Sequence, residues 1–209
     1  DKIQTKMTLE VKVSKKLVSY KFAYKELIKR VDSIKKHKSK DLLWILEHPL
    51  TYTGGIRSNE KEVLDKKIKL IKTNRGGKIT LHNPGQKIIY LAIDLNKRKK
   101  DIRNLIMNIE NSIIEFLRIY KINSYADKKN IGIWVKQKKI AAIGIRVTQW
   151  IAYHGCSINI NNSLEPYMKI IPCGLDNRKV TSVKNEIKIN IRGVEKNLKK
   201  VFTKNLKNI

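Results

Sequence analysis

The stretch Arg75-Gly76-Gly77-Lys78-Ile79-Thr80-Leu81-His82-Asn83-Pro84-Gly85-Gln86 runs directly into an apolar segment at residues 87–95. Three glycines, a proline, an arginine and a histidine within twelve residues are typical of a backbone that approaches a ligand closely. The apolar segment that follows is predicted to form a buried strand. The sequence therefore predicts a binding loop that leads into a sheet.

Other segments supply the rest of the sheet and its cover. Apolar residues recur at spacings of three and four from Tyr20 to Ile34 and again through residues 102–120, so each segment is predicted to form a helix with one buried face. A terminal helix is expected at residues 194–202. Strands are expected at residues 41–47 and 153–160, and residues 132–135 and 139–147 are expected to form a hairpin around a turn at 136–138. Strands in the middle with helices at both ends predict an α+β sheet covered by helices.

Length and composition indicate one globular domain over residues 1–209. The chain has 41% hydrophobic and 31% charged residues and contains no linker rich in glycine, serine or proline. No apolar run approaches the ~20 residues of a membrane span, so we expect an intracellular, cytoplasmic protein without a membrane partner. The sequence begins at Asp1 rather than at a methionine, which leaves open a removed targeting segment and an organellar matrix.

The charge is strongly positive, with 46 lysines and arginines against 18 acidic residues and a net charge of +28. Such a field attracts acidic partners. The excess forms no single block, which favours compositional bias as its main origin. A nucleic-acid-binding protein typically shows a clustered basic face with stacking aromatics or a known module, and the sequence shows neither. We therefore predict no nucleic-acid partner, while an acidic protein partner stays open.

A second short stretch, Ile171-Pro172-Cys173-Gly174, offers a candidate nucleophile. A cysteine between proline and glycine suits a turn that points the sulfur outward. Because the thiolate is the reactive form, Cys173 needs a neighbouring cation or base. Lys139 is a candidate, since it is the last charge before an apolar strand, where desolvation would lower its pKa. His82 and His154 are candidates by residue type, but histidines in such a context are as often hydrogen-bonded structural groups.

The remaining candidates have simpler interpretations. Cys156 and Cys173 are the only cysteines, which excludes a disulfide framework and a four-cysteine zinc site and suits a reducing compartment. Cys156 is interpreted as a small buried side chain. His48, before a proline, is interpreted as structural. For Arg75, bonding of loop carbonyls and direct contact with a substrate stay open.

Several motifs in one order resemble the lipoyl(octanoyl) transferase family. They are the segment 75–82, Pro84-Gly85-Gln86, the segment 139–144, Tyr153-His154-Gly155, and Ile171 to Gly174 followed by Val180-Thr181-Ser182. The resemblance covers residues 44–182. It implies a mixed sheet covered by helices, as in the catalytic domains of biotin and lipoate protein ligases.

The resemblance also implies acyl transfer through a covalent intermediate. Cys173 would take the octanoyl group from octanoyl-acyl carrier protein and hold it as a thioester, with Lys139 as acid and base. It would then pass the group to a lysine of lipoyl domains. These acceptors would be the lipoyl domains of 2-oxoacid dehydrogenases and the glycine cleavage H protein. Thioester exchange is nearly isoenergetic and the amide is downhill, so no cofactor, ATP or metal is expected. The family's pocket positions fall here on Arg75, Gly76, Gly77, Lys78, Ile79, Thr80, Leu81, His82, Ala142, Ile143, Gly144, Gly155, Cys156 and Ser157.

Three positions depart from the family pattern. Asn83 stands where the family has glycine, and we expect the turn to survive because asparagine tolerates left-handed geometry. Cys156 and Ser157 make the expected pocket edge more polar. Two other functions stay open: an ATP-dependent lipoate or biotin protein ligase of the same fold, which needs no cysteine, and a basic nucleic-acid-binding protein.

Overall fold

The computed structural model describes residues 9–171, 180–188 and 190–209. At its centre is a mixed seven-stranded sheet in the order β1-β2-β6-β10-β9-β8-β7. β1 and β2 are parallel, and all other neighbours are antiparallel. The strands are β1 (Leu9–Val13), β2 (Asp41–Leu46), β6 (Gln86–Asp94), β7 (Tyr125–Ala126), β8 (Ile133–Val135), β9 (Lys138–Thr148) and β10 (Ile151–Asn159).

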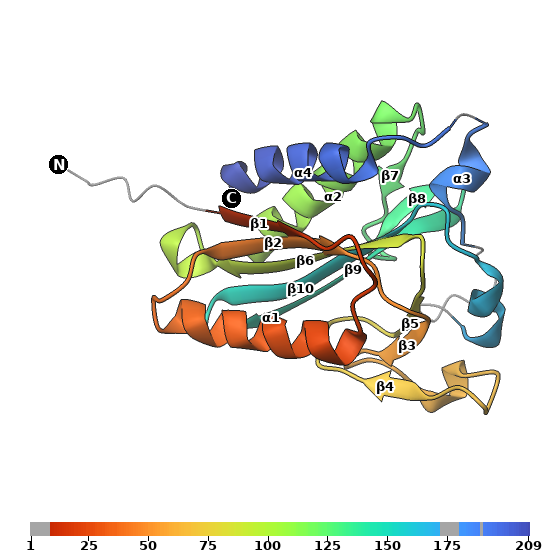
Figure 1. Ribbon diagram of the computed structural model, residues 1–209, viewed down its shortest axis with the longest axis horizontal. Helices are drawn as coiled ribbons and strands as arrows, with labels where there is room; N and C mark the ends of the chain where they lie inside the picture. The colour runs from red at the N-terminus through yellow and green to blue at the C-terminus, as the bar shows by residue number, and fades with distance from the viewer. Residues whose placement is uncertain (1–8, 172–179, 189) are drawn as a thin grey trace.

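Helices cover both faces of this sheet (Figure 1). α1 (Tyr20–Lys35) lies on one face, while α2 (Ile102–Ile119) and α4 (Val194–Asn205) lie on the other. α1 and α2 begin where sequence chemistry favours a helix start, since Ser19 accepts a hydrogen bond from the amide of Phe22 and Asp101 accepts one from Asn104. A short α3 (Val183–Glu186) precedes α4. The predicted α+β class is confirmed.

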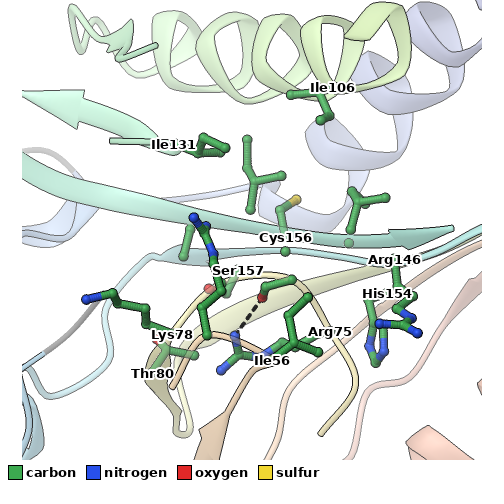
Figure 2. A pocket seen from close by; sticks show the side chains of 18 of the residues that line it. Ile56, Arg75, Lys78, Thr80, Ile106, Ile131, Arg146, His154, Cys156 and Ser157 are labelled. Atoms are coloured by element: carbon green, nitrogen blue, oxygen red, sulfur yellow. Dashed lines mark hydrogen bonds between the residues drawn. The ribbon is translucent and has the colours of Figure 1, made fainter. Parts of the chain in front are cut away.

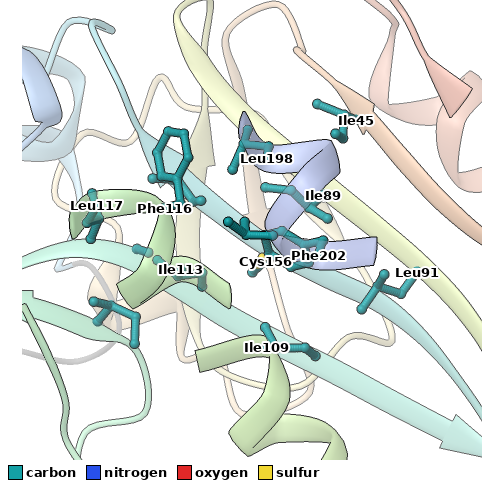
Figure 3. Close-up of a cluster of buried hydrophobic side chains, with 14 of the residues drawn as sticks. Ile45, Ile89, Leu91, Ile109, Ile113, Phe116, Leu117, Cys156, Leu198 and Phe202 are labelled. Atoms are coloured by element: carbon teal, nitrogen blue, oxygen red, sulfur yellow. The ribbon is translucent and has the colours of Figure 1, made fainter. Parts of the chain in front are cut away.

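The sheet separates two apolar cores. The larger lies between the sheet and helices α2 and α4 and includes Ile113, Phe116 and Phe202, all without exposed surface (Figure 3). The smaller lies under α1 and contains Leu27 and Trp44. No helix among the described residues is long and apolar enough to cross a membrane.

A second, three-stranded sheet was not expected from the sequence. It has the order β4-β3-β5, from β3 (Thr51–Gly54), β4 (Leu70–Lys72) and β5 (Ile79–His82), and lies on the α1 side of the main sheet (Figure 1). Strands of three or four residues are too short to display a period of two. The segment predicted as a continuous binding loop is therefore a loop at residues 75–78 followed by a strand.

Within the described residues, four 3₁₀ segments and two further strands, β1 and β7, also lay outside the prediction. The 3₁₀ segments are Glu60–Glu62, Leu95–Lys97, Glu165–Lys169 and Leu206–Asn208. The long helices and the predicted strands and hairpin are confirmed within one to three residues at their ends. The hairpin turns through Lys136 and Gln137, whose φ angles of 46° and 67° fit a tight two-residue turn.

The turn around Asn83 forms, but by a different backbone from the expected one. The amide of Gln86 donates to the carbonyl of Asn83 at 3.1 Å, which closes the turn. The positive φ, 87°, falls on Gly85 and not on Asn83. The Asn83 side chain instead donates to the Ser163 carbonyl and accepts from Asn162, so it serves as a tether to the chain after β10.

Candidate functional site

A cavity of about 730 Å³ lies alongside strands β9 and β10 and is lined by residues of both. Residues 75–78, Ile56 and Thr80 border it on one side of these strands, while Ile106 and Ile131 border it on the α2 side (Figure 2). β9 pairs with β8 only as far as Ala141, so residues 142–148 form a free sheet edge on that side. The cavity reaches both faces of the sheet around this edge.

The loop at residues 75–77 is held in place by the side chain of Arg75. Its Nη2 donates to the carbonyl and the hydroxyl of Thr53 at 2.8 and 2.9 Å, and its Nη1 donates to the carbonyl of Gly76 at 2.9 Å. Arg75 thus bonds backbone carbonyls, which is one of the two interpretations left open by the sequence, and it also lines the cavity. A Cβ on Gly144 would lie 2.9 Å from the carbonyl oxygen of Gly76, so the loop approaches β9 closer than a side chain permits.

Most of the residues expected to bind substrate lie together at this cavity. Ile79 and Leu81 do not, and this corrects the prediction. The alternation of β5 turns them into a separate apolar cluster with Tyr52, Tyr167 and Ile170, where neither Ile79 nor Leu81 has exposed surface. The expected residues that line the cavity are Arg75, Gly76, Gly77, Lys78, Thr80, His82, Lys139, Ala142, Ile143, Gly144, Gly155, Cys156 and Ser157.

The cavity also has walls that sequence reasoning missed. Arg146 follows Ala142 and Gly144 on the same face of β9, so a period of two would have found it. The segment at residues 128–131 joins from the loop before β8, and Ile102 and Ile106 join from α2. No local pattern marks these residues, because they reach the cavity only through the packing of α2 and β8 against the sheet.

Two buried histidines lie beneath the loop in contact with aromatic rings. The His82 ring stacks on Tyr20, with centroids 5.9 Å apart, and the ring of His48 meets His82 edge-on at 5.6 Å. His82 Nδ1 donates to Oε1 of Gln86 at 2.8 Å, and His48 Nε2 lies 2.9 Å from the hydroxyl of Tyr90. Burial lowers the pKa of His48 to about 4. Burial and the charge of His48 lower the pKa of His82 to about 3.

His154 closes the same side of the cavity from β10. Its φ of 69° breaks the strand alternation, so its ring stacks on Tyr153 and Tyr24 on the α1 side. Nε2 donates to Oδ1 of Asn74 at 2.7 Å. Burial, followed by the charge of Arg75, lowers the pKa of His154 to about 3. His48, His82 and His154 are each buried and hydrogen-bonded, as the structural interpretation expects.

Cys156 lies in the larger core, next to Ile89 and Phe202 (Figure 3). It is 5% exposed, and burial raises the pKa of its thiol well above the usual range. The interpretation of Cys156 as a small buried side chain is confirmed. Its sulfur forms part of the cavity wall on the α2 side without the properties of a nucleophile (Figure 2).

Lys139 is buried at the cavity, with 7% of its surface exposed and Nζ 5.5 Å from the centre of the Trp134 ring. Its carbonyl accepts a hydrogen bond of 2.9 Å from the amide of Thr181, and Val180 forms a bridge with Lys139. The candidate nucleophile Cys173 lies outside the described residues, as do Pro172 and Gly174. Among the described residues, no cluster of three His, Cys, Asp or Glu side chains is arranged to hold a metal ion.

Comparison of the sequence with known proteins identifies the family of this chain. Residues 18–203 match the family described as lipoyl protein ligase A/B catalytic domain. The chain is 40% identical over 198 residues to an octanoyltransferase of Wolbachia sp. subsp. Brugia malayi, covering 92% of this chain and 97% of that one. It is also 40% identical to an octanoyltransferase of Anaplasma phagocytophilum, covering 85% and 88%.

Solved structures share the fold at low sequence identity. A lipoate-protein ligase A bound with ATP superposes with a TM-score of 0.73 at 15% identity, covering 95% of this chain and 86% of that chain. A match to one family over most of the chain, with relatives at 40% identity over nearly their whole length, decides the assignment. The chain belongs to the lipoyl protein ligase A/B catalytic domain family.

Proposed function

We propose that this protein transfers an octanoyl group from octanoyl-acyl carrier protein to a lysine of lipoyl domains, with Cys173 as the nucleophile and Lys139 as the acid and base. The observation that carries the proposal is the burial of Lys139 at the cavity, where its carbonyl accepts a hydrogen bond of 2.9 Å from the amide of Thr181. Cys173 precedes Thr181 by eight residues in the sequence. The octanoyltransferases that match this chain support the choice of acyl group.

Each half-reaction moves one proton through Lys139. The amine of Lys139 takes the proton of the Cys173 thiol, the thiolate attacks the donor's thioester carbonyl, and the departing carrier thiolate receives that proton. In the second half, the acceptor amine attacks the Cys173 thioester, its proton passes to Lys139, and the Cys173 thiolate leaves and takes that proton from Lys139, which restores the starting state. The amide product is lower in energy than either thioester, so the sequence of steps needs no ATP.

The cavity suits an aliphatic chain. Ile143 and Ile145 line it from β9, and Ile106 and Ile131 line it from the α2 side (Figure 2). Aliphatic walls bury a hydrocarbon chain at about 25 cal/mol per Å² of covered surface. We propose that the glycine backbone at residues 76–77 lies along the chain and directs amide groups towards the developing oxyanion.

The acceptors proposed here are lipoyl domains of 2-oxoacid dehydrogenases and the glycine cleavage H protein. The test is the intact mass of the purified chain after incubation with octanoyl-acyl carrier protein. We expect one octanoyl adduct in the wild type and in Cys156→Ala, and none in Cys173→Ala. An adduct on Cys173→Ala contradicts the covalent mechanism. Transfer from free octanoate that depends on ATP supports the ligase alternative instead.

A further inference from the structure

A glycine just before β8 packs against the side chain of Lys139. Gly132 has a φ of 142°, which residues with a side chain rarely adopt. A Cβ on Gly132 would lie 2.4 Å from Cε and 3.1 Å from Nζ of Lys139, and 2.6 Å from the carbonyl oxygen of Ala141. A side chain at position 132 would therefore press on both the end of the lysine and the backbone of strand β9.

The Trp134 indole borders the other side of the same lysine. β8 and β9 pair Trp134 with Lys139 and Ile133 with Ala141, so the register skips Ile140. This irregularity places Trp134 and Lys139 side by side, with Nζ 5.5 Å from the ring centre, and Trp134 has no exposed surface. The lysine stem is confined between the backbone of residue 132 and the indole.

The backbone around this contact is tied down. The indole Nε1 of Trp134 donates to the carbonyl of Asn130 at 3.0 Å, and Oδ1 of Asp127 accepts from the amide of Asn130 at 3.2 Å. On the opposite side, the carbonyl of Lys139 accepts from the amide of Thr181. Because both backbones are anchored, a methyl group at position 132 would press on the Ala141 carbonyl and on the end of the lysine, and the lysine end is the more flexible of the two.

We propose that Gly132 is a positioning residue for Lys139: the missing side chain leaves the space that the lysine's ε-carbon and ammonium occupy when Lys139 exchanges protons. The inference rests on the proposed function for the role of Lys139. Gly132 itself is outside the residues that line the cavity, so it acts through the lysine and not on the substrate.

The experiment compares Gly132→Ala with Gly193→Ala. Gly193 also has a positive φ, 68°, but the nearest atom to its Cβ is 3.6 Å away, so Gly193→Ala tests a substitution at positive φ without a close contact. We expect Gly132→Ala to lower kcat by about tenfold or more with little change in KM for the donor, and Gly193→Ala to change neither. Adding Gly132→Ala to Lys139→Ala should cause no further loss of kcat. Equal losses with and without the lysine overturn the proposal.

A second readout does not depend on activity. Competitive labelling with an amine reagent, quantified by peptide mass spectrometry, compares Lys139 with its exposed neighbour Lys138. We expect slow labelling of Lys139 in the wild type and several-fold faster labelling in Gly132→Ala; an unchanged ratio overturns the proposal. If the wild type transfers no octanoyl group, the proposed function fails. The labelling ratio then tests separately whether Gly132 positions the Lys139 side chain.

A suppressor variant covers the case in which Gly132→Ala does not fold. Lys139→Ala removes Cε, the atom closest to the new methyl group. If the contact with the lysine is the cause, Gly132→Ala should lower the melting temperature less in the Lys139→Ala background than in the wild type. An equal drop in both backgrounds assigns the damage to the Ala141 carbonyl or to the backbone angle and overturns the proposal.

Discussion

The two cysteines of this chain have different environments, and their substitutions should differ accordingly. Cys156 is buried between the larger core and the cavity, so Cys156→Ala should cost about 1 kcal/mol of unfolding free energy through lost packing and leave turnover in place. Cys173→Ser or Cys173→Ala should abolish turnover without unfolding the chain. Urea unfolding and octanoyl transfer, measured on all three variants, check both statements. Full turnover in Cys173→Ala contradicts the proposed mechanism.

Lys139 should be needed in both half-reactions, because one group takes the thiol proton and later the amine proton. Lys139→Met keeps the length of the side chain and removes the base. We expect acylation of Cys173 and transfer to a lipoyl domain each to slow by more than tenfold, within the ~10²–10⁴ range for a general base. Rapid-quench measurement of the two steps separates them. Normal acylation in the variant would point to Lys138 or a histidine as the base.

At the scale of elements, the approach of the loop at residues 75–77 to β9 sets the width of the cavity. Gly144→Ala places a methyl group 2.9 Å from the carbonyl oxygen of Gly76, so the loop must move away from the strand. We expect KM for the octanoyl donor to rise about tenfold or less, with a smaller change in kcat, because the wall moves while Lys139 stays in place. Ala142→Gly on the same face of β9 is the matched control. A fall in kcat at unchanged KM would assign Gly144 to the chemistry instead.

At the scale of the whole molecule, the positive charge should act on the capture of acidic protein partners. The cavity lining includes Arg57, Lys128, Lys129 and Arg146. Raising the ionic strength from about 0.05 to about 0.5 M shortens the Debye length several-fold. We expect kcat/KM to fall much more for octanoyl-acyl carrier protein than for a small octanoyl thioester.

Two double variants that remove the same charge test which lysines cause the salt dependence of kcat/KM for the protein donor. Replacing Lys128 and Lys129 by alanine should weaken the salt dependence for the protein donor. Replacing Lys199 and Lys200 on α4, which do not line the cavity, should leave it unchanged. Equal salt sensitivity for the protein and small donors would show that the lysine excess is compositional.

The buried histidines should make the fold sensitive to acid. Their pKa values, about 4 for His48 and about 3 for His82 and His154, lie below the ordinary 6.5. At a pH between the folded-state pKa and 6.5, each of these histidines binds a proton in the unfolded chain but not in the folded chain. The free energy of unfolding therefore falls as the pH drops below 6.5. Each histidine contributes about 1.4 kcal/mol per pH unit in that window.

Urea unfolding at pH 7.5, 6 and 5 measures this slope. His154→Gln keeps a donor for Asn74 and should flatten the pH dependence by about a third, since one of three histidines is removed. An unchanged slope in this variant would mean that His154 is protonated in the folded chain near pH 6.

The long elements and the candidate chemistry follow from the sequence because their signals are local. The apolar face of α1 and that of α2 repeat over four turns or more, and the turn at Lys136 and Gln137 is visible between two apolar runs. The order of the motifs around Lys139 and Cys173 likewise indicates a family without any knowledge of contacts.

Tertiary structure alone decided the remaining features, because they depend on residues far apart in the chain. β3, β4 and β5 are too short to show a period, and they form a sheet only by pairing across intervening loops. The same pairing turns Ile79 away from the cavity. The contact between Gly132 and Lys139 exists because a register irregularity in β8 and β9 brings them together. Sequence spacing records which residues a chain offers, whereas strand pairing and packing determine which of them meet.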